Sequence, residues 1–214
     1  MLYMSGCLER DCLLLLHTLP DNNSGNVKYK SVMFTPQYDP GQELWDGPRT
    51  HHVGAQEVWG VDEGLPISEI NHYLNSLEIE LSNPNIWYNY KVPNNPEIHR
   101  LLHNWLVGER KGKVESPKSH IHTLRLTKSA AEIKLMKETC KISSNSILSV
   151  MKKCRSPISE HELFAMVDYQ SRMQGAEHLA YPPVIAGGSR ANIIHYINNN
   201  QNINDGDLVL MDAG

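Results

Sequence analysis

The sequence has few cysteines, no long apolar run and no excess of positive charge. Its 214 residues contain four cysteines, none in a C-x-x-C pair, so neither a zinc ribbon nor a thioredoxin motif is available. Four cysteines are also too few for a disulfide framework, and a reducing compartment is expected. The longest apolar run, Cys12–Leu16, is far shorter than the roughly 20 residues of a membrane-spanning helix. No membrane segment is predicted.

The charge balance argues against nucleic acid as a partner. Twenty Lys and Arg face 24 Asp and Glu, a net charge of −4, and nonspecific nucleic-acid binding needs clustered positive charge. With 40% hydrophobic and 21% charged residues, the composition is that of an ordinary globular protein and excludes a disordered chain.

The first 107 residues alternate between short apolar runs and amphipathic segments. Helices are predicted from Ser68 and from Pro96, the second with apolar residues at i, i+3, i+4 and i+7. Glycine and proline predict a hairpin loop over Pro20–Gly25 and another loop over Leu44–Arg49. This pattern is typical of a small α/β domain with a mixed sheet. The predicted strands are Leu13–Leu16, Val27–Phe34, Val58–Val61 and Ile86–Tyr88.

The second half begins with two well-marked helices. Ser129 with Glu132, and Ser159 with Glu162, form capping boxes, and Gly175 ends the second helix, which Pro157 opens. Short strands are then predicted at residues 179–185, 192–196 and 207–211, the last apolar enough to be buried on both faces. The predicted buried positions are Ile133, Met136, Cys140, Ile147, Met151 and Cys154 in the first helix, and Leu163, Met166, Val167 and Met173 in the second.

A polar stretch, Gly108–Ser119, is the predicted linker between the two halves. This linker divides the chain into an amino-terminal domain, residues 1–118, and a second domain, residues 119–214. The chain starts without a polar lead-in and stops directly after the apolar strand, so we expect it to be a fragment at both ends.

Most of the 11 histidines lack the companions that metal or acid–base chemistry needs. His99 and His103 have the spacing of a zincin helix, but Arg100 stands where the general-base glutamate belongs. His120 and His122 would share one face of a strand without a third ligand. We interpret these four as surface residues, together with His51, His52 and His161.

The carboxyl-terminal segment concentrates polar groups at predicted strand ends. His195 and Tyr196 end one predicted strand, and Asp212 ends the predicted buried strand. Burying an unpaired carboxylate there would cost on the order of several kcal/mol. Gly187 and Gly188 permit a close backbone approach, which a substrate cleft often needs. Each residue has an ordinary structural explanation alone, but the three together favour a site.

The ordered motifs resemble X-prolyl aminopeptidases (aminopeptidase P), in the pita-bread metallopeptidase superfamily. Two segments are similar to the family's non-catalytic domain, Trp45-Asp-Gly-Pro-Arg49 and Gly60–Ile70. The motif sequences are most similar to those of the mitochondrial-type branch. The catalytic domain is matched by Leu124–Ile133, Tyr181-Pro-Pro-Val184, Ile194-His-Tyr196 and Asp207–Gly214. The resemblance implies an α/β amino-terminal domain followed by the first part of an α+β pita-bread catalytic domain.

The family resemblance also implies chemistry. Members use two divalent metal ions, usually manganese, to activate a water that attacks the peptide bond before proline. Asp212 matches the first metal-ligating aspartate, and His195 matches the catalytic-site histidine that hydrogen-bonds the substrate. Tyr181 and Tyr196 match substrate-pocket positions and are first interpreted as packing residues with polar ends. Peptides with proline in second position are the implied partners, and the full-length protein is implied to be a homodimer.

The family's remaining four metal ligands have no counterpart in these 214 residues. A site with one carboxylate is incomplete, so we expect this chain alone to be inactive. A noncatalytic binding or dimerisation module built on the same fold, or a prolidase-type dipeptidase, are the alternatives. The resemblance suggests a mitochondrial location, and cysteine usage is equally compatible with a cytoplasmic one.

Overall fold

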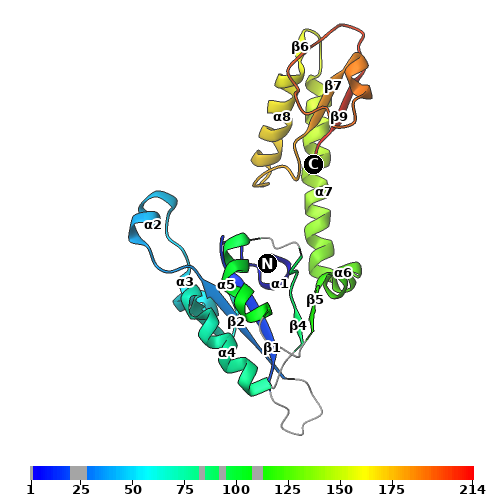
Figure 1. The fold of residues 1–214 in the computed structure, drawn as a ribbon. Coiled ribbons are helices and arrows are strands. Elements are labelled where there is room, and N and C mark those ends of the chain that lie inside the picture. Colours follow the sequence, from blue (N-terminus) through cyan, green and yellow to red (C-terminus); the bar gives the residue numbers. More distant parts are fainter. Residues whose placement is uncertain (1, 20–27, 82–84, 92–94, 108–112) are drawn as a thin grey trace. The chain divides into compact units, whose positions relative to one another are not determined.

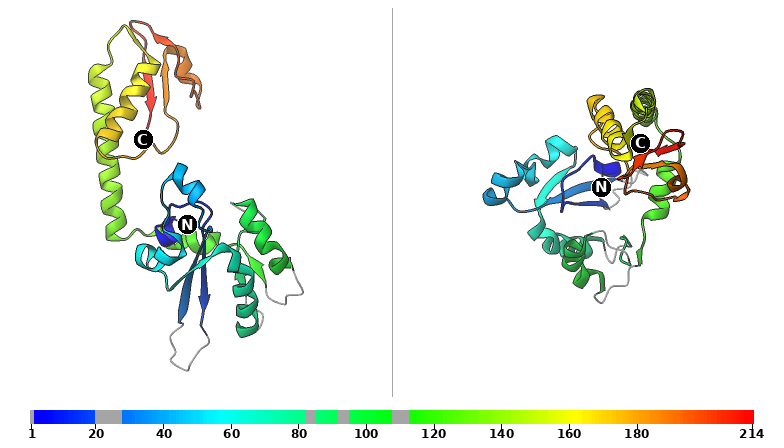
Figure 2. Two further views of the ribbon diagram at one scale, coloured as in Figure 1. Left: turned by 90° about the vertical axis from the view of Figure 1, so that its left-hand side faces the viewer. Right: turned by 90° about the horizontal axis from the view of Figure 1, so that it is seen from above.

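A computed structural model describes residues 2–19, 28–81, 85–91, 95–107 and 113–214. It divides into two compact units, Met1–Leu124 and Arg125–Gly214, which are treated separately below (Figures 1 and 2). No described helix has both the length and the apolar content needed to cross a membrane.

The first unit is built on a mixed three-stranded sheet, as the sequence predicted. Strand β1 (Leu13–Thr18) runs antiparallel to β2 (Tyr29–Thr35), and β3 (Glu63–Pro66) pairs with β2 in parallel. The predicted loop Pro20–Gly25 lies outside the described residues. β2 occupies the centre of the sheet and carries the completely buried Val32, Met33 and Phe34.

Helices pack against this sheet through the predicted apolar faces. Helix α4 (Ile70–Leu81) follows the 3-10 turn η1 (Ile67–Glu69), and α5 (Pro96–Val107) comes after β4 (Ile86–Trp87). Both predicted helices are confirmed. The short helix α1 (Leu2–Ser5) precedes the sheet. The main core consists of Val32, Phe34, Ile70, Leu74, Ile98, Leu102 and Leu106.

The strand predicted at Val58–Val61 is wrong, and the loop predicted at Leu44–Arg49 is confirmed only from Gly47 onward. Helix α2 (Pro40–Asp46) and helix α3 (His51–Trp59) occupy this region. Asp39 caps α2, because its carboxylate accepts hydrogen bonds from the backbone N–H groups of Gly41 and Gln42. The glycines punctuate helix ends instead of a long loop: Gly60 ends α3 in the left-handed conformation, with φ +66°.

The predicted linker is partly structured. Its residues 108–112 lie outside the described part of the chain, but β5 (Val114–Glu115) pairs in parallel with β4, and α6 (Lys118–Leu126) begins before the stretch ends. Polar composition indicated exposure correctly here, but it did not exclude a strand.

The second unit begins with the two predicted helices. Helix α7 (Ala130–Lys153) and helix α8 (Glu160–Met173) start at Ser129 and Ser159, and both capping boxes are present. The strand β6 (Ile158–Ser159) separates them, so Pro157 does not open α8. The core of this unit consists of Val150, Ile158, Leu163, Val167, Ile185, Ile203 and Ala213.

The apolar stripe predicted for α7 is mostly exposed. Ile133, Met136 and Met151 are 44%, 53% and 65% exposed, and Cys140 is exposed as well. The completely buried Ser146 faces α8 instead, where it accepts a hydrogen bond from the Ser171 hydroxyl at 3.2 Å. A small polar side chain lets the two helices approach closely there. Met173, at 66% exposed, is likewise not part of the α8 buried face.

Two short antiparallel strand pairs complete the second unit. Strand β7 (Val184–Gly187) pairs with β9 (Val209–Asp212), and β6 pairs with β8 (Asn202–Ile203). The strand predicted at residues 192–196 is wrong, because the 3-10 turn η2 (Gly188–Asn192) runs directly into a turn. The prediction of burial on both faces of β9 is also wrong within this unit, since Leu210 is 41% exposed.

Candidate functional site

Asp212 is the last residue of β9 and lies next to the first residue of β7. Its register partner is Val184, and its carboxylate Oδ1 accepts a hydrogen bond from the Tyr181 hydroxyl at 2.5 Å. This hydrogen bond raises the pKa of Tyr181, with a smaller contribution from burial. Asp212 is exposed, so the predicted cost of burying its charge does not arise.

The strand end that carries Asp212 is fixed by the backbone as well. The Ala180 N–H donates to the Gly214 carbonyl at 2.6 Å, which ties the segment before β7 to the residues after β9. The predicted residues Tyr181 and Asp212 are therefore in direct contact, although 31 positions separate them in the sequence.

His195 lies in the turn that follows η2, not at a strand end. Its side chain is exposed and makes no hydrogen bond to any residue in the described ranges. The neighbouring Tyr196 side chain, in contrast, is only 7% exposed, and its hydroxyl donates a hydrogen bond to Glu160 Oε2 at 2.8 Å. An exposed imidazole thus sits beside a firmly held phenol.

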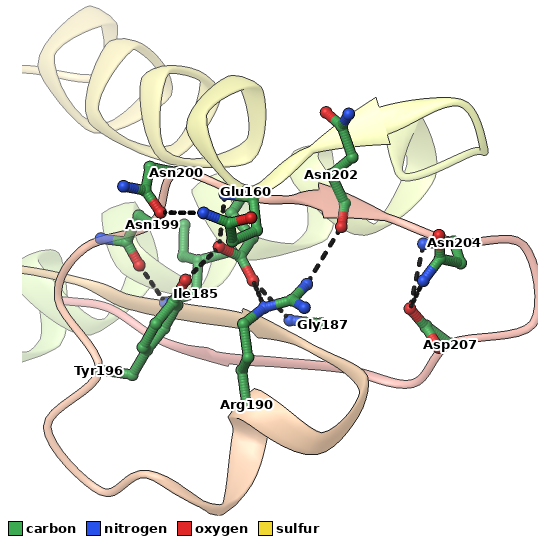
Figure 3. A network of polar contacts seen from close by, with 11 residues as sticks. Glu160, Ile185, Gly187, Arg190, Tyr196, Asn199, Asn200, Asn202, Asn204 and Asp207 are labelled. Carbon is green, nitrogen blue, oxygen red and sulfur yellow. Dashed lines mark hydrogen bonds and ion pairs between the residues drawn. The ribbon is translucent and has the colours of Figure 1, made fainter.

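Glu160, the first residue of α8, is completely buried and accepts four hydrogen bonds (Figure 3). Oε1 accepts from the Gly187 N–H at 2.9 Å and from Arg190 Nε at 2.7 Å. Oε2 accepts from the Tyr196 hydroxyl and from the Gln201 N–H at 3.0 Å. Burial by itself raises the pKa of Glu160, but these donors outweigh it and the net pKa is lowered.

Asn199 returns the chain to β7 after the His195 turn (Figure 3). Its side-chain oxygen accepts from the Ile185 N–H at 2.8 Å, and its side-chain nitrogen donates to the Pro183 carbonyl at 2.8 Å. Tyr196 packs in a small cluster with Val184. Val184, a member of this cluster, is the register partner of Asp212.

Residues 1–87 match the aminopeptidase P N-terminal domain, and residues 134–214 match metallopeptidase family M24. Over 216 aligned residues the chain is 39% identical to Xaa-Pro aminopeptidase 3 of Mus musculus, covering 100% of this chain and 42% of the relative. The chain therefore carries an aminopeptidase P N-terminal domain and part of a metallopeptidase M24 domain.

Two further relatives extend the comparison. The mitochondrial intermediate cleaving peptidase 55 of Arabidopsis thaliana is 37% identical over 213 residues, with 100% of this chain and 41% of the relative covered. A zinc-substituted aminopeptidase P from Escherichia coli in complex with product superposes with a TM-score of 0.85 at 27% identity, covering 100% and 48%. The chain thus spans less than half the length of these relatives.

These matches confirm the predicted fold: an aminopeptidase P amino-terminal domain, then the first part of a pita-bread metallopeptidase domain. Divalent metal chemistry follows from membership of a metallopeptidase family. The described residues do not form a complete metal site, because no group of three or more His, Cys, Asp or Glu side chains converges within them. One carboxylate offers two oxygens, whereas oxygen-rich sites need about six donors per cation.

His99, His103, His120 and His122 belong to no cluster of metal-ligating side chains among the described residues. His99 and His103 hydrogen-bond the hydroxyls of Tyr88 and Tyr90, each at 3.2 Å. His120 lies on helix α6, not on a strand, and its ring contacts Trp87 edge-on. His122 is on the same helix, so the predicted shared strand face does not exist.

The glycine pair serves packing inside the unit. A Cβ atom on Gly188, which has φ +57°, would come within 3.1 Å of Asp207 Oδ1, and one on Gly187 within 3.0 Å of Arg190 Nη2. Sequence reasoning missed Glu160 and Arg190. No local signal marks Glu160, because its side-chain partners lie between 27 and 41 residues away in the sequence.

Proposed function

We propose that this chain contributes the amino-terminal domain and the first metal ligand to an enzyme that releases the residue preceding proline from peptide amino termini. The observation that supports the proposal is the exposed carboxylate of Asp212 at the end of β9, with the Tyr181 hydroxyl bonded to it, in the same unit as the exposed His195. It occurs in a chain whose whole length aligns with an Xaa-Pro aminopeptidase.

Each site residue has a proposed role. Asp212 ligates one of two divalent cations, with manganese as the expected metal, because an exposed carboxylate with one phenolic partner remains available to a cation. The metal pair supplies activated water when the complete site is loaded. His195 hydrogen-bonds the reacting peptide through its exposed imidazole, and Tyr181 lines the same end of the sheet.

The 214 residues alone are proposed to be inactive. Their described part contains one of the family's expected ligands, Asp212, and no group of three or more His, Cys, Asp or Glu side chains that could hold a cation. The same observation keeps a noncatalytic binding or dimerisation module as the second candidate. Homodimer formation and a mitochondrial location are further proposals, the latter supported by the name of the Arabidopsis relative.

The test measures peptide hydrolysis by the full-length protein and by the 214-residue chain, each with added manganese. We expect the full-length protein to release the first residue of X-Pro-X tripeptides and to leave X-Ala-X peptides intact. Asp212→Asn is expected to lower this activity by more than the about 100-fold that outer-shell ligand partners cost. Cleavage of X-Pro dipeptides alone would instead support the prolidase alternative.

Two outcomes contradict the proposal. A full-length protein that hydrolyses neither tripeptides nor dipeptides would support the noncatalytic candidate. A 214-residue chain that shows manganese-dependent X-Pro hydrolysis, after purification free of host peptidases, would show that Asp212 is not part of an incomplete site.

A further inference from the structure

Glu160 is more completely hydrogen-bonded than the start of a helix requires. Glu162 already completes the α8 capping box with Ser159, so the helix end does not need a second carboxylate. A glutamate in the first turn favours the helix dipole equally well from the surface. Complete burial of the Glu160 charge adds a desolvation cost without adding anything to the helix end.

The four donors of Glu160 lie on both sides of the His195 turn. Gly187 and Arg190 precede it, and Tyr196 and Gln201 follow it (Figure 3). One carboxylate therefore holds the end of β7, the η2 turn and the returning loop together.

Additional contacts close the same segment. Arg190 Nη2 donates to the Asn202 carbonyl at 3.1 Å, and the Glu160 N–H donates to the Gln201 carbonyl at 3.0 Å. His195 has no side-chain hydrogen bond within the described ranges, so its own side chain does not fix it in place. Its position depends on its neighbours, above all on Tyr196.

We infer that Glu160 is a positioning residue for His195: its buried carboxylate clamps both ends of the turn and so sets where the imidazole stands relative to the Asp212 end of the sheet. The inference rests on the proposed function for the role of His195. Displacing a substrate-orienting group by about 1 Å can cost on the order of 10²-fold in rate, so the clamp is expected to act on turnover.

The experiment compares Glu160→Gln with Glu162→Gln. Both replace one carboxylate at the start of α8 by an amide of the same size. Among the described residues, however, the Glu162 carboxylate accepts hydrogen bonds only from Ser159, at 2.8 Å from its N–H and at 2.8 Å from its hydroxyl. The first readout is the NMR signal of the His195 ring in the 214-residue chain. The second is the pair kcat and KM of the full-length enzyme on an X-Pro tripeptide.

We expect Glu160→Gln to split or broaden the His195 signals and to lower kcat by about 10- to 100-fold, with KM changed less than about threefold. Glu162→Gln should leave both readouts unchanged. A role in stability alone would lower the folded fraction without moving the His195 signals of the folded molecules. Unchanged signals, or an unchanged kcat in an active enzyme, would overturn the inference.

The experiment also distinguishes two further outcomes: a parent enzyme without activity, and a Glu160→Gln variant that does not fold. If the parent enzyme lacks X-Pro activity, the proposed function fails, and the NMR arm still decides whether Glu160 anchors the turn. If Glu160→Gln does not fold, Tyr196→Phe replaces it, because it removes one donor of the four. That variant should show the same two changes at smaller size, and no change in either readout would overturn the inference.

Discussion

Two carboxylates of the second unit stand in opposite surroundings. Glu160 is completely buried and accepts four hydrogen bonds, whereas Asp212 is exposed and accepts one, from Tyr181. A buried charge with every lone pair occupied has no capacity for a ligand and holds backbone in place. An exposed carboxylate with open coordination contributes little to folding and can bind a cation. Glu160 therefore stabilises the fold, the scaffold, whereas Asp212 is the candidate ligand of the site.

The largest expected effect is the stability difference between Glu160→Gln and Asp212→Asn. Replacing Glu160 places an amide NH₂ against existing donors and removes the ionic partner of Arg190, which should lower the free energy of unfolding by about 2–4 kcal/mol. Asp212→Asn at an exposed position should change it by about 0.5 kcal/mol or less. Urea denaturation of both variants measures the difference, and equal losses would remove the distinction between scaffold and site.

The second effect is the loss, at acidic pH, of the stabilisation that ionised Glu160 gives to the folded state. The folded-state pKa of Glu160 lies below its ordinary value of 4.5, so the unfolded chain binds its proton first as pH falls. The stabilisation is therefore complete above about pH 4.5, the unfolded value, and is lost as pH falls through the lower folded value. The gap in unfolding free energy between the parent and Glu160→Gln should be constant from neutral pH to about pH 5 and close below it.

Unfolding curves recorded from pH 7 downward provide this measurement. Glu162→Gln is recorded beside it, and since the hydrogen bonds from Ser159 lower the pKa of Glu162 as well, its gap should close in the same direction. A gap that opened on acidification would mean that protonated Glu160 is the stabilising form, against the sign of its pKa shift.

The helices with local start signals were predictable from sequence. Ser129 and Ser159 each have a glutamate three residues later, and the side chains close the capping boxes without help from distant residues. The start of α2 at Asp39 and Pro40 is also a local signal, but it was not recognised, and only the loop suggested by Gly47-Pro48 was predicted.

The environments of the site residues were not predictable in the same way. Ile193 and Ile194 suggested a strand, yet both are exposed, 54% and 84%, because the segment is held by Tyr196 and Asn199 instead of by a ladder. Asp212 and His195 were singled out by their places at predicted strand ends, and their roles came from the family resemblance and stay predictions. Burial of Glu160 depends on partners brought in by the fold, which no spacing along the chain encodes.

The smallest expected effect is the difference in stability loss between two Tyr→Phe variants, one at Tyr196, which is bonded to Glu160, and one at Tyr181, which is bonded to Asp212. Tyr196→Phe removes a buried hydroxyl that donates to buried Glu160, and should cost about 1–2 kcal/mol of unfolding free energy. Tyr181→Phe removes a hydroxyl from a side chain that is 43% exposed and donates to exposed Asp212, where water replaces it. Its cost should be about 0.5 kcal/mol or less.

Chemical denaturation of the two variants side by side measures this pair, since the same atom is deleted from the same residue type. A loss at Tyr181 as large as that at Tyr196 would mean that the Tyr181–Asp212 contact is part of the scaffold. Asp212 would then be held by a stabilising bond that a cation has to displace, and its availability as a ligand would no longer follow from its exposure.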